Sequence, residues 1–308
     1  MNSLERPLAG YLINLSVSES EDSSARGFPE WQVNRVTLQL VAALFGQGAS
    51  VVFGHDWRDD GVMEAVFAFA RAMQPSLPVS STDLVPEPTP LQNLLPWPDI
   101  RYLKQPELDR LDSTLSVKEV ELPTDVRHLE VEARQGGPDT DIYRYVRARA
   151  LTALRHRLTE KSHARICLGG RRSGSQGRYP GIIEEALLSV RQRKPIFISC
   201  ALGGATRQII DAIEGRQMPE DFCPTPLQGV YTRFQNRQLD AVNPDCIVDR
   251  IGVWNEFSSS QPRVLANING LSQQENEELF HTPVIDRVIE LALTGLSRLR
   301  SRGDSISA

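Results

Sequence analysis

The first third of the chain alternates between short apolar runs and longer runs with helical spacing. Residues 11–17 (YLINLSV) are rich in β-forming side chains, which predicts a strand. From residue 30 onward the apolar positions recur at helical intervals as far as Gly46, which predicts a helix. A compact apolar run at 50–53 predicts a second strand, and another helical pattern opens at Gly61. This order of strand, helix, strand and helix is typical of an α/β fold.

The same alternation resumes near the middle of the chain. Helical spacing over 142 to about 161 predicts a long helix, and either Asp139 or Asp141 can cap its first turn. Four further elements are predicted after it: a strand at 164–168, a helix from Pro180, a strand at 195–199 and a helix at 205–214. Strands that end in glycine and are separated by helices predict a doubly wound, Rossmann-like parallel sheet with helices on both faces.

Other segments fall outside this alternation. Residues 75–115 are predicted to form a Pro-rich surface excursion, because eight of the twenty prolines lie between positions 75 and 106 and proline supplies no backbone donor to an inner strand. The remaining predictions are strands at 116–122 and 246–253, an amphipathic helix at 284–299 within a helical extension at 270–300, and a frayed end at 300–308. We expect all 308 residues to form a single domain.

Composition narrows the classes of function. The formal net charge is −5, from 34 Lys plus Arg against 39 Asp plus Glu, so no global positive field attracts nucleic acid or an anionic membrane. Four dispersed cysteines and five scattered histidines predict neither a disulfide framework nor a structural metal, and they favour a reducing compartment. The chain shows no run long enough to span a bilayer and no signal-peptide pattern at its start, so we expect a cytoplasmic protein.

The strongest candidate site is the segment LGGRRSGSQGRYPGIIEEA at 168–186. In a parallel sheet the loop after a strand faces the crevice where ligands bind, and the start of the next helix favours phosphate. Arginine side chains add fixed charge that can hold phosphate in a bidentate manner. The candidate ligand-binding residues of this segment are Gly169, Gly170, Arg171, Gly174, Arg178, Pro180 and Gly181.

Two acids, Glu184 and Glu185, follow one turn inside the predicted helix. One of them can accept hydrogen bonds from ribose hydroxyls or act on a glycosidic bond, so both are candidate catalytic or binding residues. The alternative is that both only complement the helix dipole.

Three more loops are expected at the same sheet edge. Their candidate ligand-binding residues are Ser16, Ser18 and Glu19 after the first strand, Gly54, His55 and Gly61 after the second, and Gly203 and Gly204 after the strand at 195–199. His55 is more often an ordinary loop histidine, and the Gly-Gly pair can serve only tight packing. If the four loops converge on one crevice, Gly54, Gly170 and Gly204 must lie along one edge of the sheet.

Several familiar motifs do not occur in the sequence. It contains no G-x-S-x-G, H-E-x-x-H, Walker A or G-x-G-x-x-G pattern, which removes support for serine hydrolase, zinc protease, P-loop and dinucleotide-dependent redox chemistry. We therefore expect no metal and no bound cofactor.

Taken in order, these loops resemble those of the SLOG superfamily, whose Rossmann-like domains include Lonely Guy phosphoribohydrolases, lysine decarboxylase-like proteins, sensor regions of melastatin-type TRP channels and Thoeris antiphage effectors. NLSVSES is similar to the small-residue loop of the family, and VVFGHDWRDDGVMEA is similar to its second strand with a Gly and Met opening a helix. Gly169, Gly170, Gly181 and Glu184 or Glu185 match the Gly-Gly loop and acid in outline. The match spans most of residues 11–214.

One departure from that pattern shapes the functional hypotheses. Lonely Guy enzymes carry a compact P-G-G-x-G-T-x-x-E, whereas RRSGSQGRYPG separates the Gly pair from the acids here. The resemblance therefore implies a sensor that binds a nucleotide-derived signal, ADP-ribose-like or cyclic, in antiphage defence or stress signalling. It also implies a homo-oligomer and an effector partner such as a TIR or sirtuin-type NAD hydrolase.

Two alternatives remain open at the level of sequence. The first is an enzyme that hydrolyses an N-glycosidic bond of a nucleotide through Glu184 or Glu185. The second is an oligomeric scaffold whose helix at 284–299 docks on a partner, although such an apolar stripe is more often ordinary core.

Overall fold

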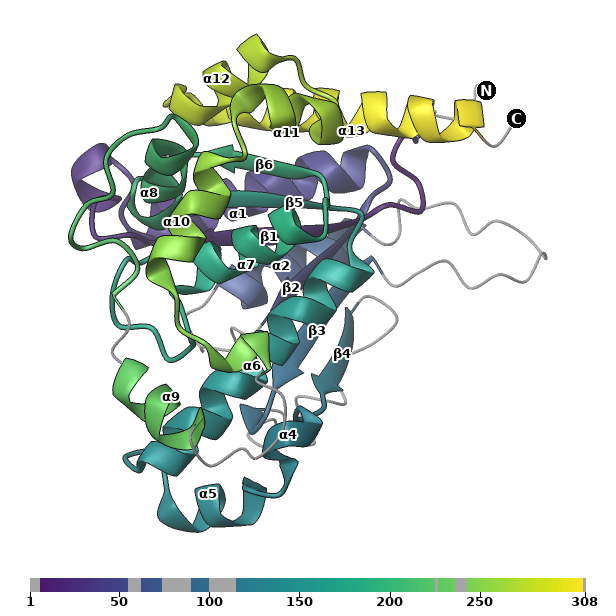
Figure 1. Cartoon of the computed structure of the whole chain (residues 1–308). Helices are drawn as coiled ribbons and strands as arrows, with labels where there is room; N and C mark the ends of the chain where they lie inside the picture. Colours follow the sequence, from purple (N-terminus) through teal and green to yellow (C-terminus); the bar gives the residue numbers. More distant parts are fainter. Residues whose placement is uncertain are drawn as a thin grey trace.

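Six parallel strands form one sheet in the order β4-β3-β2-β1-β5-β6 (Figure 1). The computed structural model describes residues 6–54, 62–73, 90–99, 115–224, 227–235 and 243–306. The strands are β1 (Leu12–Ser18), β2 (Ser50–Gly54), β3 (Leu91–Pro96), β4 (Leu115–Val120), β5 (Ala164–Gly169) and β6 (Ile196–Ser199). Every neighbouring pair runs parallel, which confirms the predicted Rossmann-like α/β architecture.

The order of the strands places a reversal of the chain beside β1. From β1 the chain builds outward through β2 and β3 to β4, and it then returns so that β5 pairs with the other side of β1. In this pairing Ser16 lies opposite Cys167, and Ser18 lies opposite Gly169. The carboxyl ends of β1 and β5 therefore flank the topological switch point of the sheet, where open α/β folds bind ligands.

Helices cover both faces of this sheet. The described helices are α1 (Glu30–Gly46), α2 (Val62–Met73), α4 (Thr124–Arg127), α5 (Glu130–Gly136), α6 (Asp141–Lys161), α7 (Gly181–Arg191), α8 (Gly204–Ile213), α9 (Gln228–Gln235), α10 (Arg250–Ser258), α11 (Pro262–Asn269), α12 (Gln273–His281) and α13 (Ile285–Ile306). The helices α1, α2 and α13 pack in one apolar core, whereas α6, α7 and α8 pack on the opposite face. Figure 1 views the sheet from the side of α6, α7 and α10, with α11, α12 and α13 stacked beyond β6.

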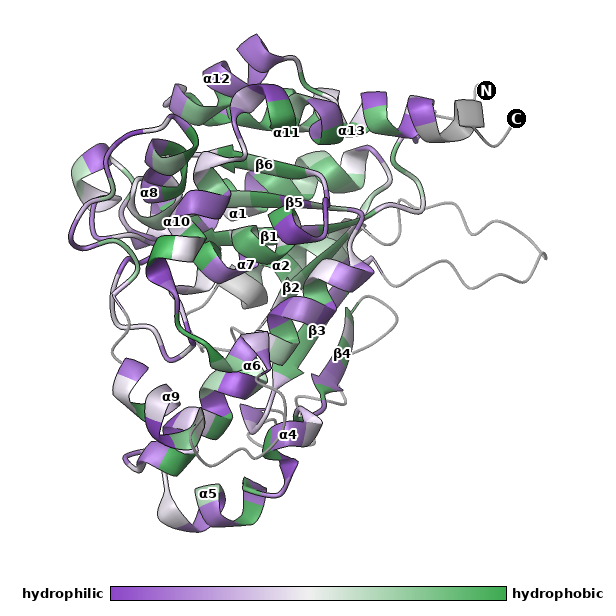
Figure 2. Cartoon of the chain, in the orientation of Figure 1, coloured by the Kyte–Doolittle hydropathy of each residue, from purple (hydrophilic) through white to green (hydrophobic). Residues whose placement is uncertain are grey.

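Alternation along β1 explains both the core and the site. Ile13 and Leu15 belong to the core that contains α1, while Asn14 and Ser16 are buried polar residues of the same strand. Figure 2 shows hydrophobic strands within a shell of helices whose outer faces are hydrophilic. One side of β1 therefore contributes to the apolar core, and the other brings two polar side chains inside the fold.

The strand β3 corrects one prediction from the sequence. It pairs with β2 on one side and β4 on the other, so the Pro-rich stretch does supply an inner strand. Its only proline, Pro96, is its last residue, so residues 91–95 all retain the backbone donors that an inner strand requires. The predicted strand at 116–122 is found as β4.

The segment predicted as a strand at 246–253 is also different. It contains the end of a 3-10 helix, Pro244–Cys246, and the start of α10. The caps of these two helices are Asn243 and Asp249, whose side chains accept from the N–H groups of Asp245 and Gly252. These two caps divide one apolar run into two helical starts.

Two helix ends also depart from prediction. The side chain of Thr140, and not that of Asp139 or Asp141, accepts from Tyr143 N–H and caps α6. At the other terminus, α13 continues to Ile306 where a frayed end is predicted. Arg298 donates to Glu275 at 2.7 Å, which ties the last turns of α13 to α12. The apolar stripe of α13 lies in the core with α1, so it is covered by the chain itself.

Some predictions lie outside the described residues. They concern His55, Gly61 and most of the Pro-rich segment, namely 75–89 and 100–114.

Among the residues that the structure does describe, no helix combines the length and apolar character required to cross a membrane.

Candidate functional site

A cavity of about 350 Å³ opens at the switch point between β1 and β5. Loops that follow β1 and β5 contribute to its wall, together with the end of β2, α1, α6 and the start of α7. Ten of the predicted ligand-binding residues line it: Ser16, Ser18, Glu19, Gly54, Gly170, Arg171, Gly174, Pro180, Gly181 and Glu185. The volume is within the usual range for a small-molecule site.

The polar lower part of the cavity is organised around Arg165. This guanidinium is 1% exposed, and its Nη1 donates to Asn14 Oδ1 at 3.0 Å, to Ser16 Oγ at 2.7 Å and to Glu185 Oε2 at 2.9 Å. Ser16 also donates to Glu185. The result is a rigid floor in which the Glu185 carboxylate lines the cavity and is held by two donors.

Asn14 adds a donor without a partner to this floor. Its side chain is 1% exposed, and its Oδ1 accepts from Arg165, but its Nδ2 has no hydrogen-bond partner. A buried amide N–H without a partner costs free energy, so this donor calls for an acceptor such as a ligand atom or an ordered water. Asn14 and Glu185 both line this cavity.

The first turn of α7 forms the opposite wall. Pro180 is the N-cap and offers no side-chain acceptor, so the first-turn N–H groups have no side-chain cap. Pro180 and Gly181 both line the cavity. An uncapped helix start beside a cavity favours an anionic group through its free N–H donors and its dipole.

Gly203 and Gly204 lie at the same edge but do not line the cavity. Gly204 has φ +64°, and a Cβ there would overlap the carbonyl oxygen of Gly170. The N–H of Gly204 donates to Asp22 Oδ2 at 3.2 Å, and the N–H of Ala205 donates to Gly170 O at 2.8 Å. The start of α8 is thus occupied by groups of the chain itself, and its glycines serve close packing. Gly169 has a similar role, because its φ is +71° and a Cβ there would overlap the carbonyl oxygen of Ser18.

The loop after β5 is fastened to the loop after β1. Glu21 accepts from the N–H groups of Arg172 and Ser173 at 3.0 and 3.2 Å, and these bonds lower the pKa of its carboxyl against the opposing effect of burial. Arg172 Nη2 also donates to Asp22 at 3.0 Å. Arg171 remains 69% exposed at the mouth, 3.8 Å from Glu19. These contacts hold the two loops together on one side of the cavity.

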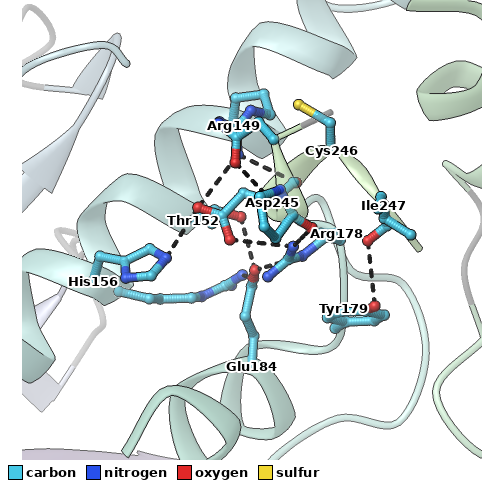
Figure 3. Close-up of polar contacts among 12 residues, drawn as sticks. Arg149, Thr152, His156, Arg178, Tyr179, Glu184, Asp245, Cys246 and Ile247 are labelled. Carbon is cyan, nitrogen blue, oxygen red and sulfur yellow. Dashed lines mark hydrogen bonds and ion pairs between the residues drawn. The ribbon is translucent and has the colours of Figure 1, made fainter. Parts of the chain in front are cut away.

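Arg178 and Glu184 are not at the cavity, contrary to the role predicted for them. Figure 3 shows both in a network between α6 and α7, where Arg178 Nε lies 3.1 Å from Glu184 Oε1. Glu184 is fully buried, accepts from Thr152 at 2.7 Å and pairs with Arg155. Burial raises the pKa of its carboxyl, but the adjacent guanidinium groups lower it further, so the net direction is downward.

The network continues to Asp245, which the sequence did not indicate. Arg178 Nη1 lies 3.3 Å from Asp245 Oδ1, and His156 Nε2 lies 3.0 Å from Asp245 Oδ2. Burial opposes ionisation of Asp245, but His156, Arg178 and Arg149 together lower its pKa to about 2 (Figure 3). The cluster anchors the 3-10 helix Pro244–Cys246 to α6 and α7.

Arg155 joins this network to the cavity. It lines the cavity, pairs with Glu184 and approaches Glu185 to 3.8 Å through its Nε. Within the described lining the acids are Glu19, Glu30 and Glu185 and the arginines are Arg155 and Arg171, so carboxylates outnumber guanidinium groups. The positive character expected from the sequence is therefore confined to the helix start and to Arg171.

Sequence reasoning missed Asn14, Glu30 and Arg155 as cavity residues. Two signals were present: polar residues alternate with apolar ones at 14 and 16, and an arginine interrupts the buried strand ARICL at 165. A charged residue in a buried strand requires a partner nearby.

No group of three or more His, Cys, Asp or Glu residues in the described ranges is placed to hold a metal ion.

The sheet order and the cavity at its switch point define a Rossmann-like ligand-binding domain. A family model described as SLOG cluster2 matches residues 7–279, and the chain therefore belongs to the SLOG family. Membership indicates a nucleotide-related sensing or binding domain. No curated protein matches the chain.

Proposed function

We propose that this protein is a sensor that binds a nucleotide-derived ligand, ADP-ribose-like or cyclic, in the cavity between β1 and β5. The observation that carries the proposal is that an uncapped helix start and a buried amide donor without a partner line one cavity. The phosphate of the ligand lies at Pro180 and Gly181, and its ribose hydroxyls meet Asn14 and Glu185 on the floor. Arg171 contributes charge at the mouth.

The proposal is tested by titration calorimetry with ADP-ribose and its cyclised isomers. Pro180→Asp supplies a carboxylate at the N-cap of α7, where it competes with the phosphate for the free N–H groups. We expect this variant to bind at least about tenfold more weakly, while Pro180→Ala leaves the helix start open and retains binding. Absence of heat from every ligand with folded wild-type protein contradicts the proposed function.

Hydrolysis of an N-glycosidic bond is a second candidate because the Glu185 carboxylate lines the cavity. Glu184 is excluded from this role by its complete burial and its pairing with Arg155 and Arg178. Incubation with nucleoside monophosphates or NAD, followed by chromatography for free base, separates cleavage from binding. Release of base by wild type but not by Glu185→Gln supports the enzyme, and unchanged substrate at high protein concentration supports the sensor.

We further propose that the sensor acts as a homo-oligomer and passes its signal to an effector protein such as a TIR or sirtuin-type NAD hydrolase, in antiphage defence or stress signalling. This extension rests on the family alone. Mass measurement with and without ligand tests assembly, since a monomer in both conditions contradicts it.

A further inference from the structure

The cavity extends past β1 into a gap between β1 and β2. The pairing of these two strands ends at Asn14 opposite Val52. On its other side β1 remains paired with β5 as far as Ser18, and the end of β2, at Gly54, is paired with β3. Residues 15–18 of β1 therefore have no paired residue in β2 within the described part of the chain, and they line the cavity together with Gly54.

Apolar residues from both faces of the sheet surround this gap. Leu15, Val33 and Phe53 belong to the core that contains α1, whereas Leu151 and Leu154 come from α6 and belong to the cluster on the opposite face. All five line the cavity, and together they form the apolar recess. Both α1 and α6 contact β2, so the recess is bounded by one helix on each face of the sheet. Apolar walls of this kind suit the flat rings of a nucleobase, and Phe53 adds an aromatic surface.

The helix α1 also supplies polar side chains beside the recess. Glu30 and Asn34 are one helical turn apart and both line the cavity, so they share one face of α1. Asn34 is half-buried, and its side chain makes no hydrogen bond to any other residue that the structure describes. The hydroxyl of Thr37, on the same face, already donates to the carbonyl oxygen of Val33. The Asn34 carboxamide therefore offers an acceptor oxygen and two N–H donors to a ligand.

The place of the base follows from the places of phosphate and ribose. In the proposed function the phosphate lies at the start of α7, and the ribose hydroxyls meet Asn14 and Glu185. Asn14 is also the last residue of β1 that pairs with β2, so it lies at the border between the polar floor and the apolar recess. The recess is the apolar part of the cavity next to that ribose, which makes it the place where a base is buried.

Asn34 and Glu30 favour a base that carries an amino group. Adenine shows an N–H donor beside a ring-nitrogen acceptor, and asparagine pairs with such an edge through two hydrogen bonds. The second N–H of the amino group can donate to Glu30, whose carboxylate only accepts. Hypoxanthine carries an oxygen in place of the amino group, so it would set an acceptor against the carboxylate of Glu30.

We propose that the apolar recess is the nucleobase subsite and that Asn34 is the specificity-determining residue that selects adenine over hypoxanthine. The proposal deepens the proposed function and rests on it, because it names the base of the same ligand. It is compatible with one phosphate or two, since the phosphates lie away from the recess, at the start of α7 and toward Arg171 at the mouth.

The test pairs ADP-ribose and each of its cyclised isomers with the counterpart in which hypoxanthine replaces adenine, and it measures both forms by titration calorimetry. We expect the adenine form to bind wild type about tenfold more tightly, because the hypoxanthine form loses a hydrogen bond and leaves an acceptor without a donor. Asn34→Leu keeps the approximate size of the side chain. It should reduce this ratio to about threefold or less, mainly by weakening the adenine form.

Asn267 provides the matched control, because it is an exposed asparagine of another helix, α11, outside the cavity lining. Asn267→Leu should leave both affinities and their ratio unchanged. Equal affinity of wild type for the two forms, or an equal effect of Asn34→Leu on both, overturns the base assignment alone. No heat from any of these ligands with folded wild-type protein overturns both the base assignment and the proposed binding function.

Saturation-transfer NMR locates the base without a variant. Ligand protons receive more saturation the closer they lie to protons of the protein. The base protons H2 and H8 of the adenine form that binds should therefore be saturated at least as strongly as its ribose protons. Base protons that are saturated much less than ribose protons would place the base outside the recess and overturn the proposal.

Discussion

Arg178 Nε lies 3.1 Å from Glu184 Oε1, and both side chains are sealed beneath α7. Arg171, seven residues earlier in the same loop, is 69% exposed at the mouth of the cavity. Two arginines that appear equivalent in the sequence therefore have different roles. One stabilises the loop from below, and the other is available to a ligand.

Replacing each arginine should separate stability from binding. Arg178→Met leaves the buried Glu184 with one fewer counter-charge, and we expect a loss of about 3–5 kcal/mol in the free energy of unfolding, measured with urea. Arg171→Met should leave this free energy unchanged and weaken ligand binding roughly fivefold, because an exposed charge contributes less than a buried one. Arg144→Met, on the exposed side of α6, is the matched control for both measurements. Equal stability of the Arg178 and Arg144 variants would contradict this assignment.

The network around Asp245 predicts a dependence of stability on acid. Its pKa is lowered from 3.8 to about 2 in the folded protein, so its stabilising contribution is present above about pH 4 and is lost as the pH falls toward 2. The contribution amounts to about 2 kcal/mol. Urea unfolding across this pH range should show that the free energy of unfolding falls less steeply with decreasing pH in Asp245→Asn than in wild type. Parallel pH dependences of the two proteins would contradict this role of Asp245.

Gly204 should tolerate a methyl group less well than Gly215. Both have positive φ, at +64° and +73°, so replacement by alanine strains the backbone by about 1 kcal/mol at either site. Only at Gly204 would the added Cβ also overlap Gly170 and Ser20, whereas it meets nothing within 4 Å at Gly215. Thermal unfolding of the two variants should therefore show a larger decrease in Tm for Gly204→Ala, and similar decreases would disprove the close approach of the two loops.

The four cysteines should be unreactive in the folded protein. All are buried free thiols, and burial raises the pKa of Cys167 and of Cys223 to about 12. A thiol reagent such as DTNB should therefore react slowly with the native protein. In denaturant, where the thiols are exposed, it should react with all four. Rapid reaction of any thiol under native conditions would show that its part of the core opens readily.

The sequence predicted β1, β2, β4, β5 and β6 and the glycines at their ends, because strand patterns and terminal glycines are local signals. It missed β3, which lies within the Pro-rich segment. Gly54 and Gly170 line one cavity, and Gly204 packs against Gly170, as the convergence of the loops requires. The rotation of a helix is harder to predict from one sequence. Glu184 and Glu185 are both adjacent to apolar positions of α7, and a rotation of about 100° per residue decides which one faces the ligand.

Residues from distant segments could not be predicted in the same way. Arg155 comes from α6 and Asp245 from a 3-10 helix, and only the folded chain brings them to the loop after β5. The caps Thr140 and Asp249 show a related difficulty, since the sequence offers several polar residues near each helix start and geometry selects one.

The position of β1 has a consequence for the order in which the chain can fold. One side of this first strand pairs with β2 about 40 residues later, but the other side pairs with β5, which follows it by roughly 150 residues. A nascent chain that emerges from the ribosome therefore exposes an open edge of its central strand until residue 169 has been made. We expect the completion of the ligand edge to be among the slow steps of folding, and truncation before that residue to favour aggregation.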